Sequence, residues 1–249
     1  MLIPAHNEEE SIRTVISGNH KVLEDLYLAS RIEDYEIVIL NDGSIDKTDA
    51  EINVACKELD KIRVMTNTSS TGIEKAFSKL YMEAKFDWVL LTPGDGQWPP
   101  SSTYECINLF LKNGAKCGVI GYRANKRNVY GWPRRILSAI FSSIANILTL
   151  SHHSDPGSIK LIPKKVQDIK FYCTGVVVEI ERIILAEWMT GFKCLKIEVE
   201  WNSRIAGKAT GANWRSLRQS AIDLPKLILN YVFMRLWTKR KFHKKQKRV

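Results

Sequence analysis

The chain has 249 residues, of which 45% are hydrophobic, and this is ordinary for one large globular α/β domain, with or without a tail. No uninterrupted apolar run approaches the roughly 18 residues of a membrane-spanning helix, which argues against a spanning anchor. The net charge of +10 calls for an anionic partner or a solvated basic segment.

The cysteine pattern argues against a zinc site and against a disulfide framework. The five cysteines are scattered without C-x-x-C spacing. We therefore expect buried thiols in a reducing compartment. Pro4 and the charged stretch from His6 follow the first residues at once, which argues against a secretory signal.

The first half of the chain alternates short apolar segments with helical patterns. The expected strands cover residues 1–3, 36–40, 62–65 and 88–91, and the expected helices begin at residues 8 and 46 and cover 72–84. This alternation predicts a mostly parallel sheet with helices on both faces. Polar clusters follow the strands, at the carboxyl ends where open α/β sheets bind ligands.

Beyond residue 121 the pattern changes. The sequence predicts a basic loop over 122–130, a helix over 133–150, a turn at 155–158, a strand then a helix over 171–189, a strand over 196–201 and a helix over 224–237. The last helix leads into a run of lysines and arginines between 239 and 248 that contains no acid. Such a run favours nucleic acid or anionic lipid head groups, or forms a solvated tail.

Three polar motifs end three of the expected strands. Pro4-Ala5-His6-Asn7-Glu8 follows the first strand, where the flat His6 ring can stack on a base or lie in a polar loop. Asn41-Asp42-Gly43-Ser44 follows the second, where a carboxylate beside glycine suits a base or ribose edge, or a turn with a helix cap. Asp95-Gly96-Gln97 follows the fourth and offers oxygen ligands to a divalent cation.

Taken in this order, the motifs resemble those of glycosyltransferase family 2, the inverting enzymes with a GT-A fold. Within that family the sequence looks most similar to polyprenyl-phosphate sugar transferases of the dolichyl-phosphate mannosyltransferase type, over about residues 1–210. The resemblance implies a GT-A (Rossmann-like) α/β catalytic domain over 1–222. Residues 223–249 would form a C-terminal amphipathic, membrane-interfacial helix and basic tail.

The resemblance also implies the residues that hold the donor. Contacts with the donor nucleotide fall to Pro4, His6, Asn7, Glu8, Asp42 and Asp95. A Mg²⁺ or Mn²⁺ ion would be held by Asp95 and Gln97, with Pro99-Pro100 following as in the family. The family's first acid of this metal loop is replaced by Pro93, which removes one oxygen ligand or ribose contact.

Several basic residues resemble the family's phosphate-binding positions. Phosphate or acceptor contacts are expected from Arg123, Arg134, Ser138, Arg204 and Lys208. Arginine suits phosphate because its donors form a rigid fork, and Arg134 and Ser138 share a helix face. The expected catalytic residues are Asp95, Arg134 and Asp155, of which Asp155 is the fallback base.

The expected acceptor is a polyprenyl (dolichyl) phosphate, and the expected donor is a GDP- or UDP-sugar. Family members that glycosylate hydroxyls often carry a Glu-Asp pair near residue 174, where this chain has Thr174-Gly175-Val176. The enzyme would then lie on the cytoplasmic face of a membrane as a peripheral protein. The alternatives are transfer to a glycan hydroxyl, or a degenerate non-catalytic protein; nucleic acid ranks last, since no nucleic-acid-binding motif accompanies the tail.

Overall fold

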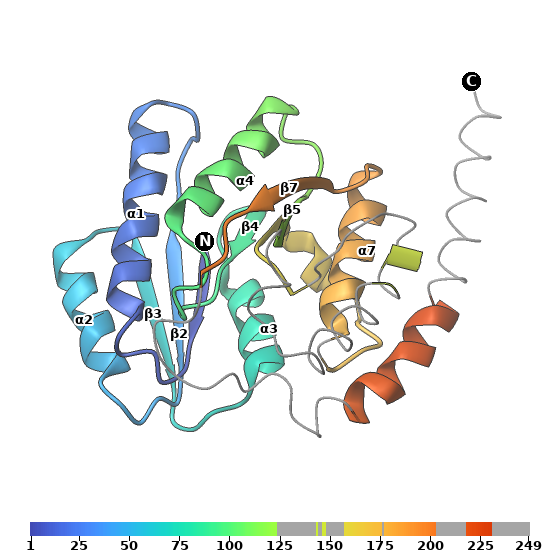
Figure 1. Ribbon diagram of the computed structural model, residues 1–249, viewed down its shortest axis with the longest axis horizontal. Helices are drawn as coiled ribbons and strands as arrows, with labels where there is room; N and C mark the ends of the chain where they lie inside the picture. Colours follow the sequence, from blue (N-terminus) through green and yellow to red (C-terminus); the bar gives the residue numbers. More distant parts are fainter. Residues whose placement is uncertain (124–142, 144–145, 148–156, 176, 203–217, 231–249) are drawn as a thin grey trace.

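The computed structural model describes residues 1–123, 143, 146–147, 157–175, 177–202 and 218–230 (Figure 1). Its strands are β1 (Leu2–Ala5), β2 (Ile37–Asp42), β3 (Ile62–Asn67), β4 (Trp88–Leu91), β5 (Val119–Arg123), β6 (Lys160–Pro163) and β7 (Leu195–Val199). Its helices are α1 (Ile12–Leu28), α2 (Thr48–Glu58), α3 (Ile73–Glu83), α4 (Pro100–Lys112), α7 (Val178–Thr190), the short 3-10 helix η1 (Lys164–Asp168) and the helix over 218–230.

The strands within these residues form one sheet in the order β3-β2-β1-β4-β6-β5-β7. Parallel pairing joins β1 to β2 and β4, β2 to β3, and β5 to β7. Only β6 runs antiparallel, against both β4 and β5. The expected mostly parallel sheet is confirmed, and six of its strands point their carboxyl ends to the same edge.

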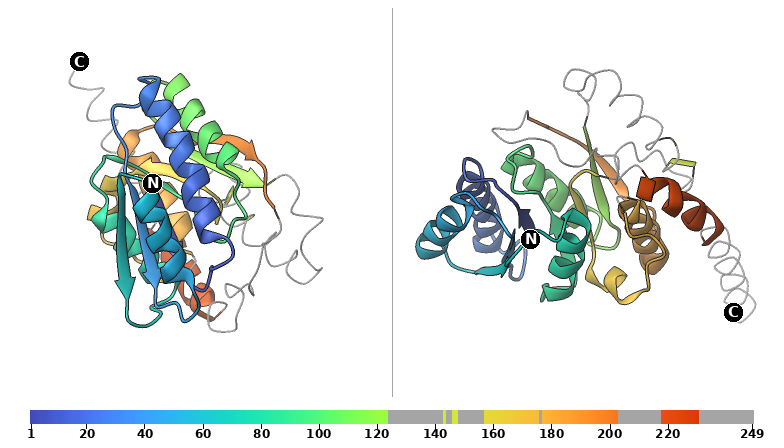
Figure 2. Two further views of the ribbon diagram at one scale, coloured as in Figure 1. Left: turned by 90° about the vertical axis from the view of Figure 1, so that its left-hand side faces the viewer. Right: turned by 90° about the horizontal axis from the view of Figure 1, so that it is seen from below.

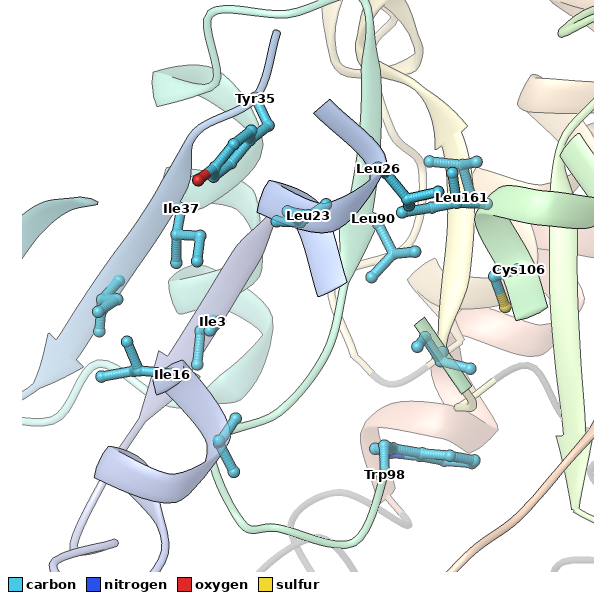
Figure 3. Packing of buried hydrophobic residues seen from close by; sticks show 14 of the residues in the cluster. Ile3, Ile16, Leu23, Leu26, Tyr35, Ile37, Leu90, Trp98, Cys106 and Leu161 are labelled. Carbon is cyan, nitrogen blue, oxygen red and sulfur yellow. The ribbon is translucent and has the colours of Figure 1, made fainter. Parts of the chain in front are cut away.

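Helices cover both faces of the sheet (Figures 1 and 2). Over one face lie α1, α2 and α4, and Ile16 of α1 packs in one cluster with Ile3 of β1 (Figure 3). Over the other face lie α3 and α7, whose Leu80 and Ile183 share a cluster with Val38 of β2. Because both faces are covered, the central strands β1, β2 and β4 are apolar over most of their length, which is the pattern seen in the sequence.

Three expectations need correction. Helix α1 begins at Ile12 rather than at Glu8, because the Glu8 carbonyl accepts the Ser11 amide at 3.1 Å in a turn that precedes the helix. Residues 171–175 do not form the strand that was expected before α7, because the amides of residues 172–175 bond to side-chain carboxylates instead of to a neighbouring strand. Helix α4 and strands β5 and β6 have no counterpart among the expected elements.

The cysteines are all free thiols, as expected, and four of the five are buried. Across the parts of the chain that the structure describes, no helix has the length and apolarity needed to cross a bilayer. The expected basic loop over 122–130 is wrong at its first two residues, which end β5, and its residues 124–130 fall outside the described residues. Most of the expected helix over 133–150 and the basic tail also fall outside them.

Candidate active site

The sheet brings the three polar motifs together at one edge. Strands β2, β1 and β4 are neighbours, and the last residue of β1, Ala5, lies opposite Asn41. The carbonyl of Pro4 accepts the Gly94 amide at 3.0 Å, which joins the first motif to the loop after β4. A ligand at this edge can therefore contact all three motifs at once.

The first and second motifs are held together by hydrogen bonds between their loops. Nδ1 of His6 donates to the Asp42 carbonyl at 2.8 Å, and the His6 side chain is exposed. The Asn7 amide donates to Ser44 Oγ at 3.0 Å, and Asn7 Oδ1 accepts the Ile45 amide at 2.9 Å. Asn7 therefore orders the loop, while the flat His6 ring is fixed at the exposed edge of the site.

The Asp42 carboxylate is only 4% exposed and is bonded to its own chain. Its two oxygens accept the amides of Thr71, at 2.9 and 3.0 Å, and of Gly72 at 3.0 Å. Side chains of Asn67 and Ser70 donate as well, at 2.7 and 3.0 Å. Burial opposes ionisation, but these hydrogen bonds outweigh it and hold the pKa of Asp42 below its ordinary value. Its contact with the donor nucleotide stays a prediction.

The loop over 67–72 was not among the site residues expected from the sequence. A Cβ on Gly43, whose φ is +67°, would lie 2.4 Å from the Ser69 carbonyl carbon, so this loop packs directly on the second motif. The signal that could have found it is the run Asn67-Thr68-Ser69-Ser70-Thr71-Gly72. This polar run follows β3 at the same edge, which is the pattern of the other motifs.

The loop after β4 is fixed from two sides. Asp95 is 4% exposed, and its Oδ1 accepts the Gln97 amide at 3.1 Å across Gly96, whose φ is +70°. Beyond β7, the Asn202 amide donates to the Gln97 carbonyl at 2.9 Å, and Gln97 Nε2 donates to the Asn202 carbonyl at 3.3 Å. The loop that carries Asp95 is thus bound to the segment that follows β7.

The oxygen atoms of this loop fit a divalent cation that arrives with a phosphorylated substrate. The described residues contain no group of three or more His, Cys, Asp or Glu side chains that could hold a metal by themselves. Asp95 and Gln97 supply one carboxylate and one amide, whereas Pro93 supplies none. Mg²⁺ usually takes one or two carboxylates together with substrate phosphates, so this small set is sufficient.

The side chain of a basic residue, Arg123, lies beside the same loop. Arg123 ends β5, and its Cζ lies 5.5 Å from the ring centroid of Trp98 and 5.0 Å from that of Trp201. Trp98 directly follows Gln97, so the structure brings this expected phosphate-binding residue to the loop of Asp95. The remaining expected residues lie outside the described residues: Arg134, Ser138, Asp155, Arg204 and Lys208.

Comparison with known proteins adds the following findings. Residues 1–174 match the family model described as Glycosyl transferase family 2. The chain is 26% identical over 140 residues to the dolichol-phosphate mannosyltransferase of Pyrococcus furiosus, covering 55% of this chain and 37% of that protein. It is 24% identical over 251 residues to the poly-beta-1,6-N-acetyl-D-glucosamine synthase of Staphylococcus aureus, covering 96% of this chain and 57% of that protein.

Among solved structures, glucosyl-3-phosphoglycerate synthase from Mycobacterium tuberculosis, in complex with Mn²⁺, uridine-diphosphate-glucose and phosphoglyceric acid, has a TM-score of 0.62. The identity is 14%, over 92% of this chain and 78% of that chain, so the likeness concerns the fold alone and confirms the expected GT-A fold. The chain spans 37% of the length of the P. furiosus relative and 57% of the length of the S. aureus relative.

Proposed function

Since the chain belongs to glycosyltransferase family 2, we propose that it transfers a sugar from a GDP- or UDP-sugar to a polyprenyl phosphate. Similarity to the dolichol-phosphate mannosyltransferase of P. furiosus supports this acceptor class. The structural observation that carries the proposal concerns the two carboxylates, Glu181 and Asp223, that bind the segment before α7, near the position where hydroxyl-glycosylating family members carry a base.

These two carboxylates are engaged by backbone amides. Oδ2 of Asp223, a side chain with no exposed surface, accepts the amides of Thr174 at 2.9 Å and Gly175 at 2.8 Å. Burial opposes ionisation, but the hydrogen bonds hold the pKa of Asp223 below its ordinary value, so it is a weak base. Glu181 accepts two further amides, each at 2.9 Å. A hydroxyl acceptor needs a base, whereas a phosphate is already anionic and needs none.

The donor side of the proposal uses the loops described above. A bound Mg²⁺ or Mn²⁺ would neutralise charge that develops on the leaving nucleoside diphosphate. Asp95 and Gln97 would hold this ion, and Arg123 would donate hydrogen bonds to a phosphate group. The exposed His6 ring would stack on the base. The roles of Arg134, Ser138, Arg204 and Lys208 toward phosphate remain part of the proposal.

Transfer to a glycan hydroxyl is the second candidate. Similarity to the S. aureus synthase favours it, because that similarity runs over 96% of this chain. Asp155 would then act as the base, because its carboxylate could accept the proton of the acceptor hydroxyl. The two candidates differ in the acceptor and in the need for a base. The acceptor that becomes labelled therefore distinguishes them.

We further propose that the helix over 218–230 (red in Figure 1) rests on a membrane surface. Its inward face is anchored by Asp223 and Leu227, neither of which has exposed surface. Its outward face exposes 45% of Ile222, 41% of Ile228 and 72% of Leu229. The basic run at 239–248 would complement anionic head groups. Contact with the cytoplasmic face would bring the enzyme to its lipid acceptor.

Vesicle binding tests the membrane surface by itself. The protein is sedimented with phosphatidylglycerol and with phosphatidylcholine vesicles, and we expect binding to the former. Leu229→Gln should weaken it about tenfold, since a buried leucine contributes roughly 1.5–3 kcal/mol. Leu28→Gln is the matched control, because Leu28 is 71% exposed at the end of α1. Equal binding by both variants would remove the helix from the proposal.

The transfer reaction tests the main proposal. Radiolabelled UDP- and GDP-sugars are incubated with the protein, Mg²⁺ or Mn²⁺, and a polyprenyl phosphate. Label that enters organic solvent and is lost with EDTA supports transfer to the lipid. Label on a glycan alone favours the second candidate, and neither transfer nor nucleotide binding indicates a degenerate protein. Asp95→Ala should abolish turnover, whereas Asp87→Ala, an exposed aspartate just before β4, should not.

A further inference from the structure

We propose that Trp98 and Trp201 are positioning residues that hold the Arg123 guanidinium in the orientation in which it receives a substrate phosphate. The inference rests on the proposed function, because it assumes that a phosphorylated substrate binds beside Asp95. It adds two residues whose aromatic rings act through Arg123 rather than on the substrate itself.

The contact geometry assigns both rings to one cation. Arg123 Cζ lies over the Trp98 ring at 5.5 Å and over the Trp201 ring at 5.0 Å, both within the range of a cation–π contact. A guanidinium is flat and carries its N–H donors around its edge. The edge is the part that pairs with two phosphate oxygens, and contacts of the guanidinium carbon with two rings limit how that edge can turn.

The two rings are themselves held by the backbone. Trp98 is 5% exposed and belongs to the same core cluster as Ile3 and Ile16 (Figure 3), and Trp201 packs against that cluster. Each tryptophan is next in sequence to one member of the pair Gln97 and Asn202, whose backbones bond at 2.9 Å. The folded chain therefore fixes the guanidinium before substrate binds, and less side-chain freedom is lost on binding.

The location gives the rings a function beyond packing. Arg123 ends β5 in register with Val199, so it lies at the same carboxyl edge as the loop of Asp95. Contacts with Trp98 and Trp201 therefore restrict the orientation of a cation that lies at the edge where the phosphorylated substrate is proposed to bind.

A half-buried tryptophan elsewhere provides the matched control. Trp88 packs against the same core cluster as Trp201, with its ring 4.5 Å from that of Phe110. It begins β4 opposite Pro163, at the other edge of the sheet from the site. Loss of Trp88 therefore tests what the loss of an indole from this core does by itself.

The experiment measures the Kd of UDP and GDP with Mn²⁺, and of farnesyl phosphate, by calorimetry. Trp201→Leu should weaken at least one of these by about 3- to 30-fold, the range of a cation–π contact. Trp201→Phe should restore most of the loss, and Trp88→Leu should leave every Kd unchanged. A loss confined to the nucleotides assigns Arg123 to the donor diphosphate, and a loss confined to farnesyl phosphate assigns it to the acceptor phosphate.

A double-substitution cycle separates positioning from independent contacts. If Trp201 acts through Arg123, the variant with both Arg123→Ala and Trp201→Leu should bind no more weakly than Arg123→Ala alone. Full additivity, an unchanged Kd in Trp201→Leu, or an equal loss in Trp88→Leu would overturn the positioning role and leave the proposed function standing. If the unaltered protein binds none of the three compounds, both the inference and the proposed function fail.

Discussion

The half of the molecule from β1 to α4 and the half from β5 to the helix over 218–230 fix their buried polar groups differently. In the first half, buried acids bond to adjacent loops, as Asp42 does to residues 67–72. In the second half, β6 and α7 share a buried group of three charges. Lys160 Nζ lies 2.7 Å from Glu179 Oε2, and Arg182 Nε lies 3.5 Å from Glu179 Oε1.

The buried charges also join the second half to the first. Arg182 has no exposed surface, lies over the Tyr81 ring at 4.6 Å and donates to Ser78 Oγ at 3.0 Å, so it holds α7 against α3. Burial opposes ionisation of Glu179, but Lys160 and Arg182 outweigh it and hold its pKa below the ordinary value. The site edge thus rests on local loop bonds on one side and on a long-range ion group on the other.

Removing the anion should produce the largest effect on stability. Glu179→Ala leaves the buried cations Lys160 and Arg182 without their counter-charge, which should lower the free energy of unfolding by about 3–5 kcal/mol. Urea denaturation measures this free energy of unfolding. Glu58→Ala is the control, since the Glu58–Arg13 pair is about half exposed and contributes at most about 1 kcal/mol. If both variants lose the same amount, the ion group does not distinguish the two halves.

The same difference explains what the sequence could predict. In the first half, strands, turns and helices follow one another within a few residues, and the motifs at Pro4, Asp42 and Asp95 end strands that pair in the expected way. Local signals are sufficient for these motifs, because each of them bonds to a loop at the same sheet edge. There were two exceptions. The start of α1 was wrong, since three glutamates favour a helix N-terminus but here form the turn before it, and helix α4 was not among the expected helices.

Local signals were insufficient in the second half. Strand β6 is four residues long. A lysine at its start would be expected at the surface, yet Lys160 is buried beside Glu179. The segment 171–175 is apolar enough for a strand, yet its amides bond to Glu181 and to Asp223, which is 49 residues from Thr174. Neither partner can be identified from the sequence around the segment. The contact of Trp201 could not be predicted for the same reason, because the Arg123 guanidinium that it contacts lies on β5.

A pair of glycines gives a smaller and more local test. Gly43 has φ +67° and an added Cβ would meet the Ser69 backbone at 2.4 Å, so Gly43→Ala should cost about 1–3 kcal/mol and weaken nucleotide binding. Gly157, before β6, has no atom within 4 Å of an added Cβ, so Gly157→Ala should change stability by less than about 0.5 kcal/mol. Thermal unfolding of both variants compares them. If Gly43→Ala leaves stability and nucleotide binding unchanged, the loop over 67–72 does not need its close contact with Gly43.

The last test uses the dependence of stability on pH in the acid range, because each half contains a buried carboxylate, Asp42 or Asp223, that accepts backbone amides and has a lowered pKa. The native pKa values of Asp42 and Asp223 are lowered, so the unfolded chain binds more protons from about pH 4 downward. Their stabilisation is present above that pH and is lost as the pH falls through the native values. Asp42→Asn and Asp223→Asn should each flatten the acid dependence of unfolding, by at most about 1.4 kcal/mol per pH unit.

Urea denaturation between pH 2.5 and 6 measures these slopes, with Asp25→Asn, an exposed aspartate of α1, as the control that should leave the slope unchanged. Limited proteolysis then separates the two halves. Asp42→Asn should expose the loop over 67–72, since Asp42 accepts its amides, and Asp223→Asn should release the helix over 218–230. Cleavage at both places in both variants would show that the two carboxylates stabilise one common unit rather than two separately fixed parts of the site edge.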